Sequence, residues 1–429
     1  MINDKIFCIV PWFEVHINAD GTYHTCGAQP PPQRTPFPPG FVEKNNVHNM
    51  KLEDWINGEY QRRVRLDKLN GIHEPRCQMC YTEEKVGSSS KRLKENLKSG
   101  ISDVNFDLTY RASSDLPHFE FSQANQGATD IMRPVSYHIN LGNECNYACK
   151  MCGPWSSSQL AVEGLKDGTY SGPARLNWTK DEKSWNHVVD YICATDNLKF
   201  VHIIGGEPLL NPRFEDLIDR LIAAGKTDIY LGFTTNGSIV DIGLIKKLNT
   251  FKHVDIGISV ECFGVLNDHI RKGTNTVEVL EHIDTYLKYR SKDHMYITVR
   301  PVPSALSVHT LDDLYRWCVD RQVDVMTNIL VRPVHLQIRQ LPVEIKQRLI
   351  KKYQQWQFSE PAPADSNPRD PTWFKQHIDS EIHAVINLLK QDGDLMQTKK
   401  LYDTISTWGW FSNLEVAKYF AVGAQDYNY

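Results

Sequence analysis

Three cysteines lie close together in the chain, at Cys145, Cys149 and Cys152, in the spacing C-x3-C-x2-C. An alternating apolar run over 137–142 precedes them and predicts a strand, so we expect the cysteines on a loop at its carboxyl end. A structural zinc site has four protein ligands, whereas three thiolates leave one position of a metal centre open. Cysteine thiolates also hold iron–sulfur clusters, and three of them leave one iron free for another ligand. The alternative is three thiols without a metal.

A second cysteine group stands near the amino terminus. Alternating apolar residues on either side of a turn, over 13–26, predict a hairpin that brings Cys8 and Cys26 toward one end of the ribbon. A C-x2-C pair, Cys77 and Cys80, follows later in the chain. Two cysteine pairs predict a four-thiolate site, and their spacing suits zinc as well as an iron–sulfur cluster.

Composition favours a soluble globular protein. The chain has 429 residues, 41% hydrophobic and 23% charged, which predicts roughly two to four domains. A net charge of −4 gives no general case for nucleic-acid binding. No apolar run approaches the ~20 residues that span a bilayer, and the first residues are not typical of a signal peptide. Seven of the ten cysteines fall into the two groups, which favours metal centres in the reducing cytoplasm.

The elements that must position these cysteines are apolar strands that alternate with helices. Such an alternation predicts an α/β fold, with a parallel sheet and crossover helices. Helical patterns also occur over 52–64, ending at Gly71, and over 91–97, 342–357 and 376–391, whereas residues 99–134 show no sustained period. The six strand-like runs are 137–142, 200–204, 229–235, 254–260, 295–301 and 325–331.

Polar and glycine residues follow several of these runs, where parallel strands place their carboxyl ends at one edge of the sheet. The glycines permit close approach of the backbone to a ligand, and a glutamate can pair with an ammonium group. Asn236-Gly237 is also an ordinary turn, and an arginine here can equally form a structural ion pair. The candidates are Gly205, Gly206, Glu207, Pro208, Asn236, Ser259, Glu261, Arg271, Arg300 and Asn328.

The three-cysteine loop after a first strand, together with the run 205–208, resembles the signature of the radical S-adenosylmethionine (radical SAM) superfamily. The resemblance implies a [4Fe-4S] cluster on Cys145, Cys149 and Cys152 whose free iron binds SAM. Reductive cleavage of SAM then yields a 5′-deoxyadenosyl radical that takes a hydrogen atom from the substrate. Met151 stands where the family usually has an aromatic residue against the adenine.

The resemblance also assigns the candidate residues. It implies that the run 205–208 binds the ammonium group of SAM through Glu207 and that Arg271 binds the SAM carboxylate. It also implies that Ser259 and Glu261 lie at the ribose. The Thr-Asn-Gly run ending at Gly237 resembles a strand end common in these enzymes. Cys262 is a candidate hydrogen-atom donor, although a small buried thiol is the simpler interpretation. Cys193 and Cys318 fall in helical patterns and are expected in the core.

The amino-terminal cysteines are similar to the SPASM and twitch modules of radical SAM enzymes. Four cysteines, Cys8, Cys26, Cys77 and Cys80, resemble the shorter twitch form with one auxiliary iron–sulfur cluster. Most relatives have this module after the barrel rather than before it. The predicted organisation is a twitch-like module at 1–85, a connector at 86–134, a partial (β/α)6 barrel at 135–335 and a helical, aromatic-rich region at 336–429.

The predicted function is therefore a radical SAM oxidoreductase or transferase with one auxiliary cluster, acting on a peptide or protein. Its electron donor is expected to be a flavodoxin or ferredoxin, and neither a membrane nor a nucleic acid is an expected partner. A small-molecule dehydrogenase is the alternative enzyme. A zinc-stabilised interaction protein without catalysis is the alternative from another class.

Overall fold

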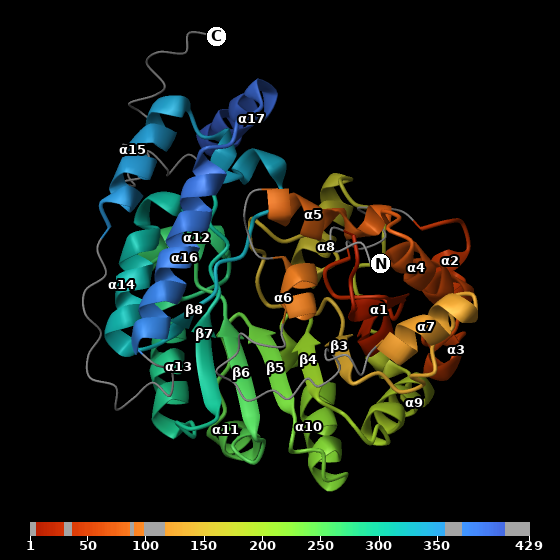
Figure 1. The fold of residues 1–429 in the computed structure, drawn as a ribbon. Coiled ribbons are helices and arrows are strands. Elements are labelled where there is room, and N and C mark those ends of the chain that lie inside the picture. The colour runs from red at the N-terminus through yellow and green to blue at the C-terminus, as the bar shows by residue number, and fades with distance from the viewer. Residues whose placement is uncertain (1–5, 30–36, 86–89, 98–115, 357–370, 408–429) are drawn as a thin grey trace. The chain divides into compact units, whose positions relative to one another are not determined.

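The computed structural model describes five stretches of the chain, which carry both cysteine groups (Figure 1). Several aromatic residues of the region predicted at 336–429 lie outside this part of the chain, namely Trp408, Trp410, Phe411, Tyr419 and Phe420. The described residues are 6–29, 37–85, 90–97, 116–356 and 371–407.

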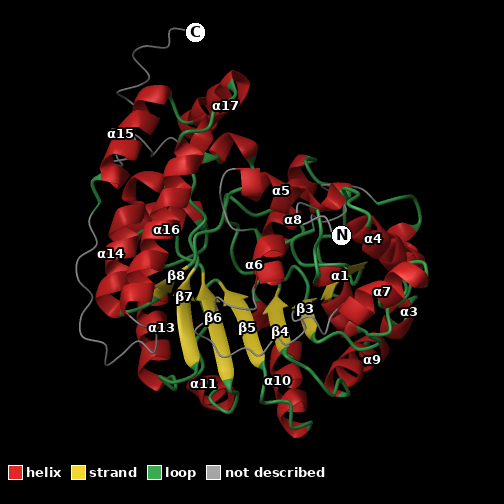
Figure 2. Ribbon diagram, in the orientation of Figure 1, coloured by secondary structure: helices red, strands yellow, loops and turns green. Residues whose placement is uncertain are grey.

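The described strands form one sheet with the order β2-β1-β3-β4-β5-β6-β7-β8 (Figure 2). β2 is antiparallel to β1, whereas the β1–β3, β3–β4, β4–β5 and β7–β8 pairs are parallel. This confirms the predicted α/β class with a mostly parallel sheet. The strands are β1 Glu14–Ile17, β2 Tyr23–His24, β3 Ser136–Asn140, β4 Phe200–Ile204, β5 Tyr230–Thr235, β6 His253–Ile258, β7 Met295–Val299 and β8 Asp324–Val325.

Two details of the sheet differ from the sequence prediction. The run 325–331 is strand only at β8, because the neighbouring segment contains Pro301 and Pro303, which cannot donate the backbone bonds that a ladder needs. The predicted amino-terminal hairpin is confirmed as β1 and β2, but it also joins the main sheet, since β1 pairs in parallel with β3.

Helices connect the strands and follow them at the carboxyl terminus. The helix predicted over 52–64 is two helices, because Asn57 and Gly58 interrupt it. The described helices are α1 Val10–Phe13, α2 Phe41–Lys44, α3 Leu52–Ile56, α4 Glu59–Leu69, α5 Gln78–Lys85, α6 Lys91–Leu97, α7 Leu116–Ala124, α8 Ser158–Asp167, α9 Glu182–Cys193, α10 Arg213–Ala223, α11 Ile242–Leu248, α12 Gly264–Ile270, α13 Thr276–Tyr289, α14 Leu311–Arg321, α15 Val343–Gln354, α16 Pro371–Leu389 and α17 Leu395–Ser406.

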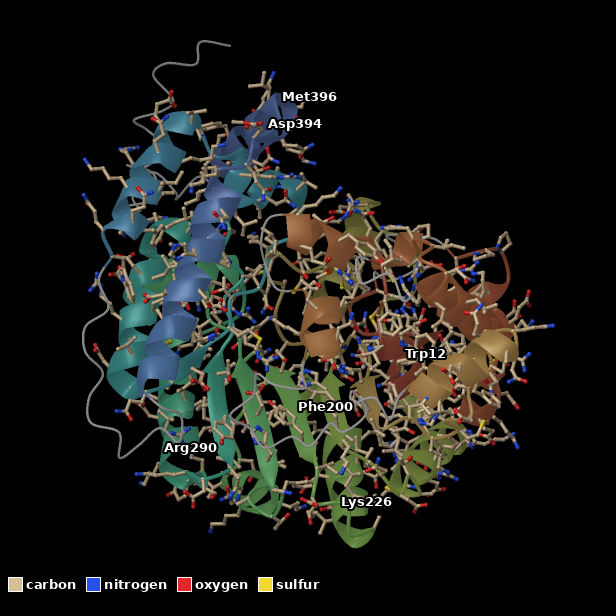
Figure 3. The ribbon with its side chains drawn as sticks, in the orientation of Figure 1. Trp12, Phe200, Lys226, Arg290, Asp394 and Met396 are labelled. Atoms are coloured by element: carbon tan, nitrogen blue, oxygen red, sulfur yellow. The ribbon has the colours of Figure 1, made fainter. Side chains whose placement is uncertain are left out.

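Helix α7 was not predicted, because its apolar residues do not form a single stripe. Phe119 is buried against Phe7 and Trp12, with ring centroids 5.2 and 5.1 Å away, whereas Phe121 is exposed. The indole Nε1 of Trp12 donates to Ser122 Oγ at 2.8 Å, so α7 and α1 hold each other (Figure 3). Tertiary packing therefore specifies this helix.

The chain divides into two compact units. The first contains Met1–Asn146, Gly153–Thr234 and Lys246–Asp255, and the second contains Tyr147–Cys152, Thr235–Ile245 and Ile256–Tyr429. No described helix is long and apolar enough to cross a membrane.

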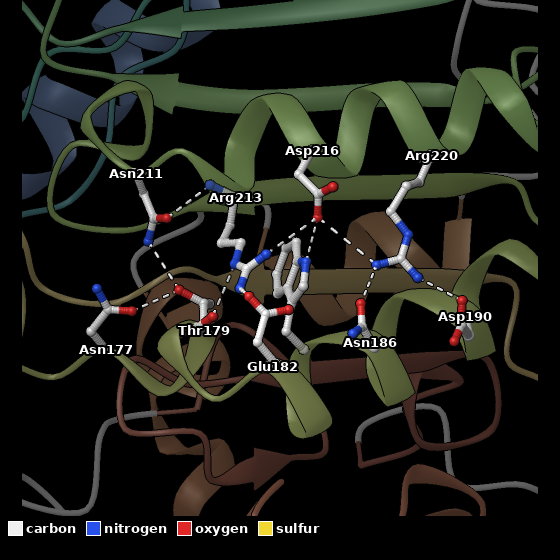
Figure 4. Close-up of polar contacts among 10 residues, drawn as sticks. Asn177, Thr179, Glu182, Asn186, Asp190, Asn211, Arg213, Asp216 and Arg220 are labelled. Carbon is white, nitrogen blue, oxygen red and sulfur yellow. Dashed lines mark hydrogen bonds and ion pairs between the residues drawn. The ribbon is translucent and has the colours of Figure 1, made fainter.

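In the first unit, α9 and α10 are joined by a polar network over their apolar packing (Figure 4). The carboxylate of Asp216 accepts a hydrogen bond from the buried indole of Trp185 and lies 3.9 Å from both Arg213 and Arg220. Phe214 of α10 contacts Phe233 of β5, with ring centroids 5.0 Å apart. This packing fixes the helix that follows the 205–208 run.

In the second unit, α14, α15 and α16 each bury apolar residues. The apolar residues of α14 include Leu314 and Cys318, which are fully buried, as predicted for Cys318. Cys193, in α9 of the first unit, is only partly buried. The helical patterns over 342–357 and 376–391 are confirmed as α15 and α16.

Candidate cluster and cofactor site

The loop that begins after β3 is fixed by one buried asparagine of the first unit. The side chain of Asn143 donates to Pro154 O at 2.8 Å and Ala174 O at 3.2 Å, and it accepts from Leu176 N at 2.7 Å. Cys145, buried two residues later, donates its backbone N–H to Ser158 Oγ. Backbone groups around Cys145 are thus satisfied locally, and its thiol is free of any disulfide.

The glycine-rich run after β4 packs directly on this loop within the first unit. Gly206 N donates to Gly142 O at 2.9 Å, and Glu207 N donates to Glu144 O at 2.8 Å. A Cβ at Gly206 would lie 2.3 Å from Glu144 O, so only glycine permits this approach. Two motifs that the sequence separates by about 60 residues therefore contact each other through their backbones.

The other two cysteines of the loop belong to the second unit. Ala148 N donates to Lys272 O, and Lys150 N donates to Ile270 O, each at 2.8 Å. This segment therefore lies beside Arg271, at the end of α12. The hydrogen bond from Cys152, assisted by the positive charge of Arg271, lowers the pKa of Cys149 to about 7. A thiol with that pKa is readily deprotonated, as a metal ligand must be.

Arg271 is held by a buried ion pair. Its Nη1 donates to Glu261 Oε1 at 2.8 Å, and Glu261 Oε2 accepts from Val302 N at 2.5 Å. Burial raises the pKa of the Glu261 carboxyl. Burial lowers the pKa of Arg271, but the nearby Cys149 and Glu261 raise it by more, so it lies above its usual range. We take both groups as charged, because both carboxylate oxygens accept hydrogen bonds.

The remaining barrel candidates have varied surroundings in the second unit. Asn236 is buried and its Oδ1 accepts from Ser238 N at 2.9 Å, which is a turn contact. Ser259 donates its backbone N–H to Thr235 O. Cys262 is fully buried, and burial raises the pKa of its thiol well above the ordinary value. Its surroundings are those of a core thiol.

Arg300 and Asn328 do not end their strands as predicted. Arg300 follows β7 by one residue, and its guanidinium lies against the backbone of Gly257, where a Cβ would be 2.2 Å from Arg300 Nε. Asn328 lies beyond β8, with its backbone N–H donating to Pro301 O at 2.8 Å. Only Arg300 therefore remains beside a strand end.

The amino-terminal cysteines gather within the first unit. Burial raises the pKa of all four thiols, and neighbouring thiols raise it further, Cys77 acting on Cys8 and both Cys77 and Cys80 acting on Cys26. Lysines oppose this effect. Lys68 lowers the pKa of Cys77, and Lys91 lowers that of Cys26.

The donor set at each group suits a thiolate-bound centre. None of the ten cysteines, all of them described, forms a disulfide. Among the described residues, no group of three or more His, Cys, Asp or Glu is arranged to hold a single metal ion. In the first unit the amino-terminal thiols lie near two lysines, and in the second unit the pKa of Cys149 is depressed; both features favour negative charge on sulfur.

Residues 139–318 match the family model described as the radical SAM superfamily. The matched stretch includes the three-cysteine loop, the 205–208 run, Glu261 and Arg271. The four amino-terminal cysteines lie outside the matched residues.

Solved structures of low identity are similar to this chain. One, described as native anSMEcpe with bound AdoMet, is 19% identical with a TM-score of 0.40, covering 51% of this chain and 59% of that chain. Another, Streptococcus suis SuiB bound to the precursor peptide SuiA, is 15% identical with a TM-score of 0.39, covering 72% and 65%. The chain thus spans less than two thirds of these proteins' lengths. No curated protein matches significantly.

Sequence reasoning missed several residues that shape these sites. Asn143, Lys68 and Lys91 act through contacts with other segments of the chain, and nothing in the local sequence marks the two lysines. A lysine at the first position of α6 gives no sign of contact with β1. For Asn143 the detectable signal was an asparagine two residues before the first cysteine, in a segment predicted as a loop.

Proposed function

We propose that this protein is a radical SAM enzyme whose SAM-binding [4Fe-4S] cluster is held by Cys145, Cys149 and Cys152. The observation that carries the proposal is the backbone contact between the Cys145 loop and the run 205–208, within the residues that match the radical SAM family model. The bound cluster and SAM would supply a 5′-deoxyadenosyl radical for hydrogen abstraction. The protein supplies orientation and exclusion of side reactions.

The residues around the loop have roles that their contacts support. Gly205, Gly206 and Pro208 shape the backbone beside the loop, and Glu207, whose carboxylate is buried, would receive the ammonium group of SAM. Arg271 would receive the SAM carboxylate, and Glu261 would position Arg271 through their ion pair.

Ser259 and Asn236 remain proposed cofactor-binding residues. Ser259 lies one residue beyond β6 and Asn236 one residue beyond β5, so both follow carboxyl ends of strands. Glu261, placed by resemblance at the ribose, is better supported as the partner of Arg271, because its two oxygens are already engaged.

We propose in addition that Cys8, Cys26, Cys77 and Cys80 hold one auxiliary iron–sulfur cluster. Such a cluster would ligate the substrate or accept the electron released when a substrate radical is oxidised. Lys68 and Lys91 support this assignment, because two ammonium groups beside four thiols offset the negative charge of a thiolate-bound cluster.

The proposed substrate is a peptide or protein, and the proposed reductant is a flavodoxin or ferredoxin in the cytoplasm. Three of the similar solved structures are described with bound peptides. A small-molecule dehydrogenase is the second enzymatic candidate. Product analysis with a peptide library against a metabolite pool separates them, since each candidate predicts 5′-deoxyadenosine formation with only one substrate class.

The central experiment uses anaerobically reconstituted full-length protein. We expect iron and sulfide, visible absorbance bleached by dithionite, and release of 5′-deoxyadenosine from SAM. The triple variant with Cys145, Cys149 and Cys152 replaced by alanine should lose one cluster and all SAM cleavage. Cys193→Ala, a thiol outside both groups, is the matched control and should retain both.

Two results would contradict the proposed function. SAM cleavage by the triple variant would falsify the role of the loop. Colourless protein that contains zinc and releases no 5′-deoxyadenosine supports a zinc-stabilised interaction protein.

A further inference from the structure

One lysine of the first unit lies on the buried face of α4. Gln61, Val64 and Lys68 follow one another at helical spacing, and each has at most 1% of its surface exposed. Arg63, on another side of the same helix, is exposed. A lysine is almost never buried to this extent unless its charge is paired. The partners of Lys68 therefore need an explanation.

A tyrosine, rather than a carboxylate, holds the ammonium group of Lys68. Lys68 Nζ donates to Tyr81 Oη at 3.1 Å, and Tyr81 Oη donates to Ile6 O at 3.2 Å. Among the described residues, no Asp or Glu forms an ion pair with this ammonium group. Lys91, by contrast, donates to the carboxylate of Glu14 at 2.6 Å. The positive charge of Lys68 thus has no acidic counter-charge in this part of the chain, whereas that of Lys91 has one.

The contacts of Lys68 join two segments that carry amino-terminal cysteines. Tyr81 directly follows Cys80 in α5, and Ile6 stands two residues before Cys8. The hydroxyl that accepts from Lys68 therefore bridges both segments. Burial and this bridge keep the ammonium group at a fixed position beside the thiols, instead of at the end of a freely rotating side chain.

Hydrogen bonds reach all four amino-terminal sulfurs, and one of their donors is different in kind. Backbone N–H groups donate to three of the sulfurs, namely those of Cys8, Cys26 and Cys80. Cys77 instead accepts from the ammonium group of Lys68 and from the side chain of Gln29. Among these donors, Lys68 is the one that carries a charge. It is also one that a substitution can remove without changing the backbone.

A fixed positive charge beside such a centre favours its reduction. One-electron reduction makes a thiolate-bound iron–sulfur centre more negative by one charge. The reduction potential depends on that net charge, on hydrogen bonds to the sulfurs and on solvent exposure. In a buried site little water screens the interaction, so a nearby ammonium group stabilises the added electron. Lys68 meets these conditions, because it is buried and has no acidic partner among the described residues.

We propose that Lys68, acting through Cys77, sets the reduction potential of the amino-terminal centre and makes this centre the electron acceptor. The inference rests on the proposed auxiliary cluster and adds the direction of electron transfer. The substrate radical loses one electron and one proton as a double bond forms in it. The electron reduces the oxidised centre, water takes the proton, and no bond forms or breaks at the centre. Lys91 contributes less, since Glu14 already balances its charge.

The test measures an equilibrium potential at a single pH. The protein is the reconstituted full chain with Cys145, Cys149 and Cys152 replaced by alanine, so that only the amino-terminal centre is titrated. Iron and sulfide contents establish equal loading of the variants. We expect Lys68→Met to lower the equilibrium constant for one-electron reduction about tenfold or more, which is a fall of about 59 mV in the midpoint potential. Lys68→Arg keeps the charge and should retain the original potential.

A lysine elsewhere in the first unit provides the matched control. Lys226 follows α10, and its ammonium group donates to Thr195 O at 2.9 Å, so Lys226→Met should leave the potential unchanged (Figure 3). Lys68→Gln also removes the charge, and it replaces Lys68→Met if that variant fails to fold.

The contrary outcomes are separate from those of the proposed function. A smaller fall on removal of the charge, or an equal fall in Lys68→Arg or Lys226→Met, overturns the role of Lys68 and leaves the centre in place. A chain that retains Lys68 but holds no reducible centre overturns the auxiliary cluster itself.

Discussion

The ion pair between Glu261 and Arg271 shows how one residue can fix the position of another in the candidate site. Both side chains are buried, and Arg271 lies beside the segment that carries Cys149 and Cys152. A buried pair is balanced only as long as both charges are present. Glu261 therefore fixes the position and the charge of Arg271, whichever anionic group Arg271 receives.

We predict that Glu261→Gln lowers the free energy of unfolding by about 3 kcal/mol, because it leaves the Arg271 charge buried without its counter-charge. Urea unfolding of the metal-free protein measures this loss. Lys252→Gln breaks the exposed pair with Asp228 and serves as the control, with an expected loss below about 1 kcal/mol. Equal losses in the two variants would show that the buried pair contributes no more to the free energy of unfolding than the exposed pair.

At the scale of elements, the pairing of β1 with β3 places the amino-terminal segment in the same sheet as the strands that follow it. The same pairing puts His16 and His138 in register on one face of the sheet. Burial lowers the pKa of His16 from about 6.5 to about 3. The folded protein thus keeps this imidazole neutral at pH values where the unfolded chain protonates it.

This difference predicts a pH dependence of stability. Between pH 6.5 and 3 the unfolded state binds a proton that the folded state does not, so the stability due to His16 is complete above pH 6.5 and is lost as the pH falls. The slope reaches about 1.4 kcal/mol per pH unit for one group. His16→Phe should reduce the slope, measured by urea unfolding from pH 4.5 to 7.

The exposed His383 of α16 provides the matched control for this measurement. His383→Phe should keep the slope of the original protein, since the side chain is exposed in the folded structure. A pH slope of stability that His16→Phe leaves unchanged would contradict the burial of a neutral imidazole at His16.

At the scale of the whole molecule, the amino-terminal segments depend on one buried arginine. Arg65 of α4 donates to Ile56 O at 2.6 Å, Pro11 O at 3.0 Å and Gly127 O at 3.1 Å. Its guanidinium therefore joins α1, the end of α3 and the turn after α7. Planar geometry and several donors make arginine suited to such a role.

We predict that Arg65→Met destabilises the protein by at least about 3 kcal/mol, because three buried carbonyl groups lose a donor. Arg63→Met, two residues away on the exposed side of α4, should cost less than about 1 kcal/mol. Urea unfolding monitored by tryptophan fluorescence measures both. Comparable losses would mean that Arg65 does not hold these segments together.

Local patterns were sufficient to find the chemistry-bearing motifs and most of the elements around them. Cysteine spacing, the glycine-rich run and the strand runs are such patterns, and the family match of residues 139–318, the mostly parallel sheet, α15 and α16 agree with what they predict. Local periodicity is sufficient here because each strand and helix records its own buried face within a few residues.

The β1–β3 pairing, helix α7 and the burial of the Glu261–Arg271 ion pair followed only from the folded chain. Each depends on contacts with residues far apart in the chain, such as His16 with His138 and Glu261 with Val302. Alternation within a strand says which residues share a face, but it contains no information on which strand lies beside it or in what register. Those contacts follow from packing of the folded chain.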